Sequence, residues 1–335
     1  MRSNPGGVFV NVKTPPRTAG RRFDPPHKGE GKKWLRQHSR MFEIFGIPSQ
    51  ALFSQLLIGL INGSFYALLS LGLAVIFGML NIINFTHGAQ YMLGAFAAFL
   101  LLQYTGIGYW PALIVAPVLV GLVGMAIERT MLQWLYKLDH LYGLLLTFGL
   151  ALIIEGLARN YYGSAGLPYQ MPEALVGGYD LGFMRLPIYR AWVIVASLAV
   201  CLGTWFVIER TKLGSYLRAA TENPTLVRAF GINVPRMITF TYGFGVALAA
   251  FAGVMAAPIY NVSPQMGSSL IIVVFAVVVI GGMGSIMGAI VTGFGLGVIE
   301  GLTKVFFPEA SNTVIFVIMA IVLLVRPAGL FGRRA

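Results

Sequence analysis

The sequence predicts an all-α fold, a polytopic membrane protein with eight to nine hydrophobic segments. Of the 335 residues, 57% are hydrophobic and 11% are charged, and the mean hydropathy is +0.76. In a soluble domain about a quarter of the residues are charged, so most of the surface of this chain cannot face water. The segment 51–80 contains no Asp, Glu, Lys or Arg, and about 20 apolar residues suffice to cross a bilayer. We therefore expect the chain to be embedded in membrane lipid.

Hydropathy divides the chain after residue 50 into eight apolar segments. They are 51–80, 87–104, 110–130, 141–159, 190–208, 237–258, 268–300 and 313–326. The segment 268–300 is interrupted by the sequence Gly-Gly-Met-Gly-Ser at 281–285. Its length and this glycine-rich break predict two short membrane segments or a re-entrant hairpin, not one straight helix. Whether 51–80 crosses once or twice is left open.

Residues 1–40 differ in composition from the rest of the chain. They contain ten of the 24 Lys and Arg residues, are rich in Pro and Gly, and show no helical periodicity. This composition predicts a disordered basic extension. Residues 1–40 also lack the apolar core of a secretory signal. Residues 41–335 are expected to form a single transmembrane domain with one long basic loop at 209–236.

The remaining positive charges predict the orientation of the segments. If the loop 209–236 is cytoplasmic and 268–300 is a hairpin, ten Lys and Arg residues after residue 40 lie inside and four lie outside. This distribution follows the positive-inside rule. It also places Met41 outside, although ten positive charges precede it; two crossings by 51–80, or a chain without the extension, would remove that conflict. The excess positive charge reflects topology, and no nucleic-acid partner is expected.

The loop 209–236 carries the signals of one short helix. Asn223 followed by Pro224 is typical of an N-cap and a first helical position. Gly231 is typical of the left-handed residue that follows a helix, so the helix is expected over 224–230. A helix of about two turns is marginal in water and needs a surface to lie against. The alternative is a solvated connector. The apolar side chains expected to be exposed to a partner groove are Leu226, Val227, Phe230 and Ile232.

Five motifs follow one another along the chain. They are GLINGSFYAL at 59–68, INFTHG with MLGA at 83–95, RA, NP, RA and GI within 218–232, GGMGSIMGA at 281–289 and RPAGLFG at 326–332. Together they resemble permeases of the branched-chain amino acid ABC transporters, the LivH type, over residues 41–332. Thr86 stands where this family usually has Ala, and Thr292 where it often has Gly; both residues are small. One motif alone is weak, whereas five in the same order are specific.

The resemblance implies a multi-pass permease subunit of the cell inner membrane that imports branched-chain or related amino acids. Its implied partners are a second permease subunit in a LivM-type heterodimer, two cytoplasmic ATPase subunits and a periplasmic substrate-binding protein. The sequence has no G-x-x-x-x-G-K-[ST] motif. ATP is therefore expected on the partner subunits, with no cofactor and no enzymatic activity on this chain. A permease of the same family for urea or short amides is an alternative.

The loop residues implied to couple this chain to the ATPases belong to the short helix and its flanks. They are Arg218, Glu222, Asn223, Pro224, Arg228, Ala229, Phe230, Gly231 and Ile232.

A second set of residues interrupts the apolar segments with polar side chains or glycines. Polar groups at membrane depth are costly, and irregular backbone there lines a cavity or is packed against protein. A translocation path or gate is one interpretation, and a hydrogen-bonded turn between helices is the other. The candidates are Asn62, Asn81, Asn84, Phe85, His87, Gly88, Gln90, Gly281, Gly282 and Gly284.

Two acidic residues lie inside apolar segments. Glu155 has Arg159 four residues later, and Glu300 has Lys304 at the same spacing, so each is expected to form a local ion pair. Close helix packing is expected along a ladder of glycines that ends beside Glu300. These glycines are Gly293, Gly297 and Gly301.

Other transport and enzyme classes fit the sequence less well. A proton-coupled carrier or channel would hold several paired intramembrane charges or a ring-like filter, and an intramembrane enzyme would need an activated nucleophile or a metal motif. No nucleophile or acid is spaced near His87, so no catalytic residue is expected. The single cysteine, Cys201, excludes an intrachain disulfide, and the lack of a His/Cys cluster predicts no metal site.

We predict that translation of the native protein starts at Met41, because Met41 directly precedes the first apolar segment and residues 1–40 conflict with the orientation. Mass spectrometry of protein isolated from its own cells should find no peptide from 1–40. Any such peptide would contradict the prediction.

Overall fold

The computed structural model describes residues 43–44, 47–80, 83–136, 138–181 and 185–332. The helices belong to one compact unit, Ile44–Ala335. The extension expected at 1–40 and the candidate Asn81 lie outside the described residues.

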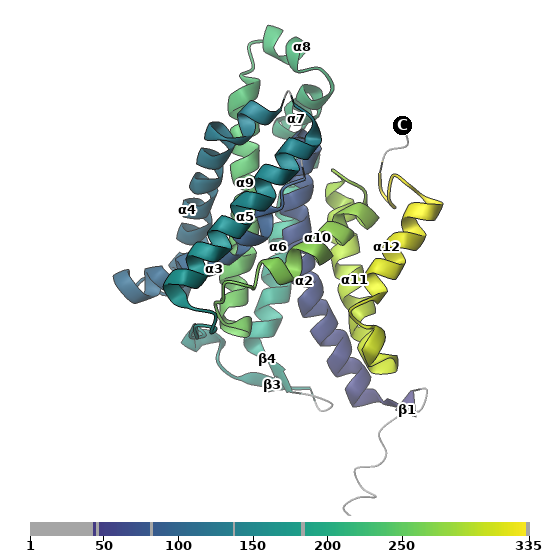
Figure 1. Cartoon of the computed structure of the whole chain (residues 1–335). Helices are drawn as coiled ribbons and strands as arrows, with labels where there is room; N and C mark the ends of the chain where they lie inside the picture. The colour runs from purple at the N-terminus through teal and green to yellow at the C-terminus, as the bar shows by residue number, and fades with distance from the viewer. Residues whose placement is uncertain (1–42, 45–46, 81–82, 137, 182–184, 333–335) are drawn as a thin grey trace, which may run out of the picture. The chain divides into compact units, whose positions relative to one another are not determined.

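Nine apolar helices make up most of the described chain (Figure 1). They are α2 (Ser49–Leu80), α3 (Thr86–Thr105), α4 (Tyr109–Thr130), α5 (His140–Tyr162), α6 (Ile188–Arg210), α9 (Val234–Tyr260), α10 (Ser268–Gly281), α11 (Ile286–Phe306) and α12 (Val314–Val325). Six of these, α2, α4, α5, α6, α9 and α11, are long and apolar enough to cross a membrane. The chain is therefore an all-α, multi-pass membrane protein, as the composition predicts.

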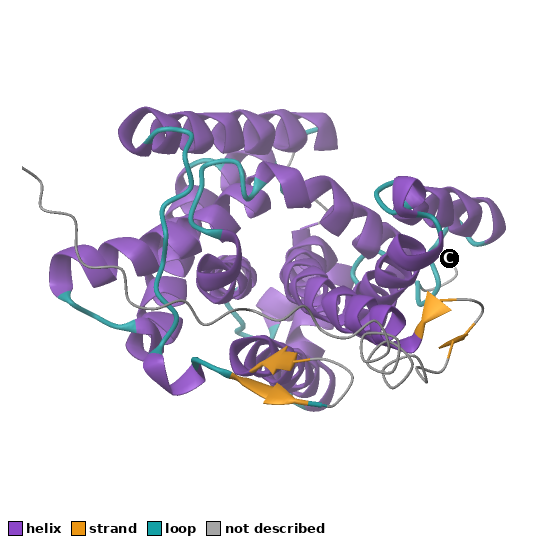
Figure 2. Ribbon diagram, turned by 90° about the horizontal axis from the view of Figure 1, so that it is seen from below, coloured by secondary structure: helices purple, strands orange, loops and turns teal. Residues whose placement is uncertain are grey.

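Short elements connect the apolar helices. Two of them, α7 (Lys212–Glu222) and α8 (Pro224–Ala229), lie between α6 and α9. The others are the 3-10 helices η1 (Leu132–Leu135), η2 (Glu173–Leu175) and η3 (Pro308–Ala310) and the strands β1 (Glu43–Ile44), β2 (Ile47–Pro48), β3 (Gly178–Asp180) and β4 (Arg185–Pro187). Strands β3 and β4 pair antiparallel at the end of the bundle that faces the viewer in Figure 2.

Helix α2 is one continuous helix and lies at the centre of the bundle, so the segment 51–80 does not fold as two helices. It is apolar on all sides and largely buried, as expected of a helix that is surrounded by others. Its side chains, among them Phe65, Leu68 and Leu71, enter the main hydrophobic core with residues of α3 and α9.

Glycines bring α2 and α11 into backbone contact. A Cβ atom added to Gly59 would lie 2.5 Å from the carbonyl oxygen of Gly297, and one added to Gly293 would lie 2.5 Å from Cα of Ala67. These approaches leave no room for a side chain at either position. The predicted packing face along the late glycine ladder is confirmed.

The expected break in the segment 268–300 is confirmed. Helix α10 ends at Gly281 and α11 begins at Ile286, and both Gly282 (φ 103°) and Gly284 (φ 80°) adopt the left-handed backbone that glycine favours. Ser285 caps α11 by accepting a hydrogen bond from the backbone N–H of Gly288 at 3.1 Å.

The loop between α6 and α9 and the α10–α11 break lie at the same end of the bundle. Thr221 Oγ1, which donates to the carbonyl oxygen of Leu217 at 2.8 Å, lies 3.4 Å from the carbonyl oxygen of Gly78, near the end of α2. Gly284 packs against the same Gly78. We call this the cytoplasmic end, from the distribution of Lys and Arg, and the end with β3 and β4 the outer end (Figure 1).

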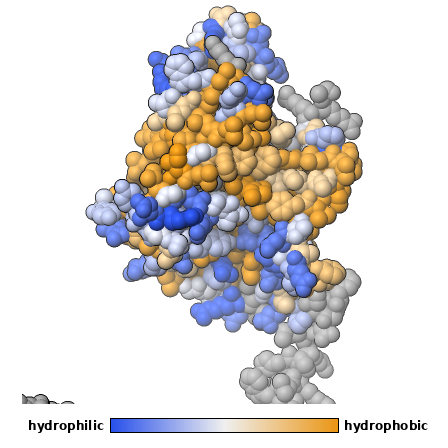
Figure 3. All heavy atoms as spheres, in the orientation of Figure 1, coloured by the Kyte–Doolittle hydropathy of each residue, from blue (hydrophilic) through white to orange (hydrophobic). Residues whose placement is uncertain are grey.

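The periphery of the bundle is apolar. Helix α5 is largely exposed, and its outward side chains include Leu145, Leu152 and Leu157. On the face drawn in Figure 3, a broad hydrophobic band separates two more hydrophilic ends. This band matches the hydrocarbon core of a bilayer.

We predict that Gly297→Ala destabilises the protein by about 1–3 kcal/mol, because its methyl group would collide with the carbonyl oxygen of Gly59. The matched control is Gly295→Ala on the same helix, where an added Cβ meets nothing within 4 Å. Thermal denaturation of the detergent-solubilised variants measures the difference. Equal midpoints for both variants would contradict this account of the α2–α11 contact.

Candidate functional site

The short helix α8 has the ends that the sequence predicts. Asn223 Oδ1 accepts a hydrogen bond from the backbone N–H of Leu226 at 3.0 Å, and Pro224 occupies the first turn. Gly231 follows with φ 80°. The helix ends at Ala229, one residue earlier than expected, and Phe230 is its C-cap.

The expectation that four apolar side chains of this loop are exposed is wrong for two of them. Leu226 and Phe230 are 54% and 77% exposed, whereas Val227 is buried and Ile232 packs beside it. Their inner partner is Ala220 of α7, a helix that the sequence analysis did not predict. A helix as short as α8 needs such an inner face to be stable, so only its outer edge is free for a partner.

Helix α7 is fixed to the end of α6. Arg218 donates to the carbonyl oxygen of Ile208 at 3.2 Å and pairs with Glu209 at 3.3 Å. The other candidate residues of the loop, Glu222, Arg228 and Ala229, are exposed. The outer edge of the loop is thus partly charged, around the apolar side chains of Leu226 and Phe230.

A cleft of about 740 Å³ lies beside α7 at the cytoplasmic end. Its walls are the ends of α2 and α6, the α10–α11 break and the chain after α12. Arg218 and Gly284 both line it, so the loop 209–236 and the glycine break face one space.

The last described residues hold the break in place. The backbone N–H groups of Leu330 and Phe331 donate to the carbonyl oxygens of Ile280 and Gly281 at 2.8 and 3.0 Å. A Cβ on Gly282 would lie 2.5 Å from the backbone nitrogen of Gly332. Of the three candidate glycines here, only Gly284 lines the cleft, and Gly281 and Gly282 are buried.

Asn84, Gln90 and Tyr242 form a buried polar cluster at the start of α3. Asn84 Nδ2 and Gln90 Nε2 donate to the Tyr242 hydroxyl oxygen at 3.1 and 3.2 Å, and Asn84 Nδ2 also approaches Gln90 Oε1 at 3.4 Å. Each of the three residues is 1% exposed. The cluster ties the turn before α3 to the middle of α9.

The neighbouring candidates also serve contacts between helices. His87 Nε2 lies 3.0 Å from the carbonyl oxygen of Leu69, and Gly88 is packed against Gly267. The backbone N–H of Phe85 donates to Thr147 Oγ1 at 3.2 Å. These candidates line neither the cytoplasmic cleft nor the outer cavity described below, so the described contacts favour the interhelical turn over an open path.

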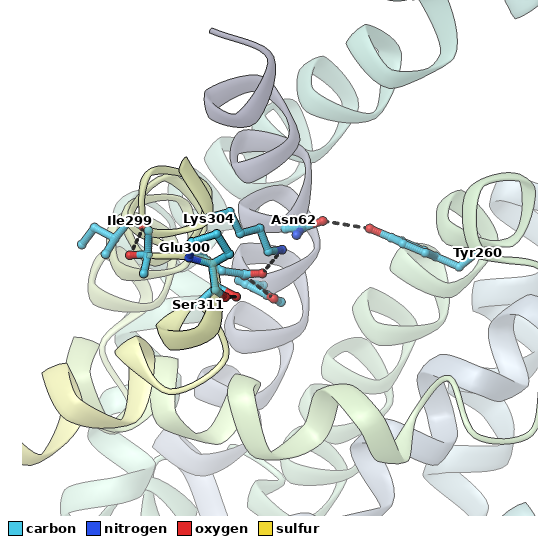
Figure 4. Close-up of polar contacts among 9 residues, drawn as sticks. Asn62, Tyr260, Ile299, Glu300, Lys304 and Ser311 are labelled. Carbon is cyan, nitrogen blue, oxygen red and sulfur yellow. Dashed lines mark hydrogen bonds and ion pairs between the residues drawn. The ribbon is translucent and has the colours of Figure 1, made fainter. Parts of the chain in front are cut away.

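Asn62, in contrast, lies in a cavity of about 400 Å³ at the outer end, between α2, α3, α9 and α10. Tyr260 Oη donates to Asn62 Oδ1 at 2.9 Å (Figure 4). The Tyr260 ring meets the Phe65 ring edge-on, with the ring centroids 5.7 Å apart.

An ion pair stands beside this cavity. Lys304 Nζ lies 2.5 Å from Glu300 Oε1, and the hydroxyl of Tyr66, which lines the cavity, donates to Glu300 Oε2 at 2.7 Å. The pair expected between Glu155 and Arg159 is also present, at 2.6 Å. Both local ion pairs are confirmed, but Tyr66 was not anticipated as a partner.

The residues that the sequence analysis missed are mainly tyrosines within apolar segments. Tyr66, Tyr242 and Tyr260 each carry one polar atom at the end of an apolar ring, and a buried tyrosine hydroxyl usually has a hydrogen-bond partner. Their spacing gives no local signal, because their partners Glu300, Asn84 and Asn62 are far away in the sequence.

The acidic residue Glu128 at the cytoplasmic end of α4 was also missed. It is buried and accepts hydrogen bonds from Tyr136 Oη at 2.5 Å and Thr239 Oγ1 at 2.6 Å. Burial, and then the bond to Glu128, raise the pKa of Tyr136 far above its usual range. Tyr136 thus stays protonated as a donor and joins the loop after α4 to α9 through Glu128.

We predict that Tyr242→Phe destabilises the protein by about 1–3 kcal/mol, because the buried amides of Asn84 and Gln90 lose their shared acceptor. Tyr161→Phe is the control, since Tyr161 is 78% exposed, and it should change stability by less than about 0.5 kcal/mol. Thermal denaturation in detergent compares the two. A Tyr242→Phe protein as stable as the control would mean that the cluster does not hold α3 to α9.

Comparisons with known proteins identify the family of this chain. Residues 55–323 match the family described as branched-chain amino acid transport system / permease component. The chain is 32% identical over 297 residues to the high-affinity branched-chain amino acid transport system permease protein BraD of Pseudomonas aeruginosa, covering 83% of this chain and 95% of that protein. It is 31% identical over 294 residues to LivH of Escherichia coli, with the same coverage, and 28% identical over 290 residues to LivM of Escherichia coli, covering 79% and 67%. The chain belongs to the family of branched-chain amino acid transport system permease components.

Proposed function

We propose that this chain is the permease subunit of an ATP-driven importer of branched-chain or related amino acids in the inner membrane. Family membership supports the transport class. The observation that carries the coupling role is the outer edge of α8, where Leu226 and Phe230 are exposed at the cytoplasmic end, outside the hydrophobic band. An apolar edge of a short helix is suited to a groove on a partner protein.

The energy source lies on separate chains. The sequence has no phosphate-binding glycine-rich motif with Lys and Ser or Thr, so we assign ATP to two cytoplasmic ATPase subunits. The chain itself is a transport subunit and not an enzyme, and it needs no cofactor of its own.

Movement of the coupling loop is transmitted to the α10–α11 break, which lines the cytoplasmic cleft together with α7. Arg218 fixes α7 to the end of α6, and Thr221 of α7 lies against the carbonyl oxygen of Gly78 on α2. Gly78 in turn contacts Gly284 in the α10–α11 break. A partner that binds α8 differently in two states therefore shifts the equilibrium between two arrangements of the break.

Two further partners complete the importer. A second, related permease is supported by the similarity of this chain to both LivH and LivM. A substrate-binding protein outside the cell membrane is expected to dock on the outer loop around β3 and β4, where Val176 and Tyr179 are 63% and 64% exposed. Exposed aromatic and apolar side chains in a polar surround are typical of interfaces.

We predict that Phe230→Asp and Gly231→Val each reduce ATP-dependent leucine uptake by more than about tenfold, the scale of losing an interface anchor. The first places a charge in the apolar contact, and the second forces a β-branched residue into φ 80°. Uptake is measured in proteoliposomes that contain the complete transporter.

The matched controls are Phe230→Leu, which keeps an apolar side chain, and Gly231→Asn, since Asn tolerates the left-handed backbone. Both should retain most of the uptake. The amount of membrane-inserted protein and its elution in size-exclusion chromatography should be the same for all four variants. Normal uptake by Phe230→Asp and Gly231→Val would refute the coupling role.

A further inference from the structure

The outer cavity has the volume and the mixture of polar and apolar lining groups that a small-molecule site requires. Its volume of about 400 Å³ lies in the range of about 300–1,000 Å³ that is usual for such sites. Polar lining groups include the amide of Asn62 and the hydroxyl of Ser269, and the apolar lining includes Phe65, Met266 and Leu270. A ligand with one polar end and one apolar end can match both.

The lining of this cavity carries no formal charge. Its described members are amides, hydroxyls, aromatic rings and aliphatic side chains. The nearest carboxylate that the lining contacts, Glu300, is already paired with Lys304 and accepts the Tyr66 hydroxyl. A ligand with a charged side chain would therefore lose its hydration without gaining an opposite charge, which is costly. The ammonium and carboxylate groups that every amino acid carries can bond to the polar lining groups, whereas a charged side chain would place a further charge against Phe65 and Leu270.

One hydrogen bond joins the two sides of the cavity. Tyr260 at the end of α9 donates to Asn62 on α2 (Figure 4), and its ring lies against Phe65. We call this contact the outer latch. It is formed by two neutral groups, so it can open without separating charges.

The chain beside the latch is strained. Asn261 has φ 59° and ψ 156°, a region that essentially only glycine adopts. The next residue, Val262, exchanges two backbone hydrogen bonds of 2.8 Å with Leu167 of the outer loop. This pairing holds Asn261 in place and thereby fixes Tyr260 over the cavity. Strain of this kind occurs at ligand clamps.

We propose that the outer cavity is a transit site for an amino acid with an uncharged, apolar side chain, closed on one side by the Tyr260–Asn62 latch. The proposal rests on the proposed function and adds a place for the amino acid on this chain and the contact that closes it. The apolar side chain of the amino acid lies against Phe65 and Leu270, and its charged ends face Asn62 and Ser269. Urea or a short amide would leave the apolar wall unmatched.

Cysteine protection tests the site directly. Ser269→Cys places a thiol in the cavity. The control is Ser268→Cys at the preceding residue, which is also exposed but does not line the cavity. Both are made in the full chain with Cys201→Ala, which removes the buried native thiol. Labelling by a membrane-impermeant maleimide is followed with leucine, glutamate, lysine or urea present. Gln265→Cys, an exposed lining position, serves if Ser269→Cys does not insert.

Leucine at about ten times its Kd should slow labelling of Ser269→Cys about tenfold, because only about a tenth of the sites remain empty. Glutamate, lysine and urea should not slow it, and Ser268→Cys should be labelled equally with every additive. Adding Tyr260→Phe, which removes only the latch hydroxyl, should accelerate labelling at residue 269 and leave residue 268 unchanged.

Three results would overturn the proposal. They are no protection by leucine, equal protection by glutamate or urea, and equal protection of both thiols.

Failure of the site and failure of the transport function are distinguishable. Protection by leucine without ATP-dependent uptake would keep the site and reject the importer, whereas normal uptake without protection would keep the importer and reject the site.

Discussion

The close approach of α2 and α11 is the contact on which the other features of the bundle depend. Both helices have glycine where their backbones meet, as at Gly59 and Gly297, and without side chains between them the two helices are in register along most of their length. That register brings Gly284 against Gly78 at the cytoplasmic end and Glu300 within reach of Tyr66 toward the outer end. Both helices bound the cytoplasmic cleft, whereas the outer cavity lies between α2, α3, α9 and α10. The outer cavity is connected to α11 through Tyr66, which lines it and donates to Glu300.

Polar groups within the membrane region are concentrated at the junctions between helices. Asn84, Gln90 and Tyr242 join α3 to α9, and Glu300 joins α11 to α2 through Tyr66. A hydrogen bond at this depth has no water to compete with it, and an unpaired group is costly. Such contacts specify which helices are neighbours more strictly than apolar packing does. The outer cavity differs from these junctions, because its lining has amide and hydroxyl groups but no charged side chain.

The two ends of the bundle differ in how they can move. At the cytoplasmic end Arg218 joins α7 to the end of α6 through the carbonyl oxygen of Ile208 and an ion pair with Glu209. At the outer end a neutral hydrogen bond of 2.9 Å between Tyr260 and Asn62 spans the cavity. The first contact involves a charged side chain with two acceptors, whereas the second joins two neutral groups that can part without separating charges.

The sequence by itself determines the features that depend on neighbouring residues. Membrane segments follow from runs of apolar residues, the α10–α11 break from its glycines, and the start of α8 from Asn223 and Pro224, because each is a local property of the backbone. Tertiary structure alone decides the rest. The inward position of Val227 depends on the packing of α8 against α7, an amphipathic helix that a search for apolar segments does not detect, and the Tyr66–Glu300 bond joins residues 234 positions apart. Contacts at such separations depend on helix packing, which no local sequence pattern encodes.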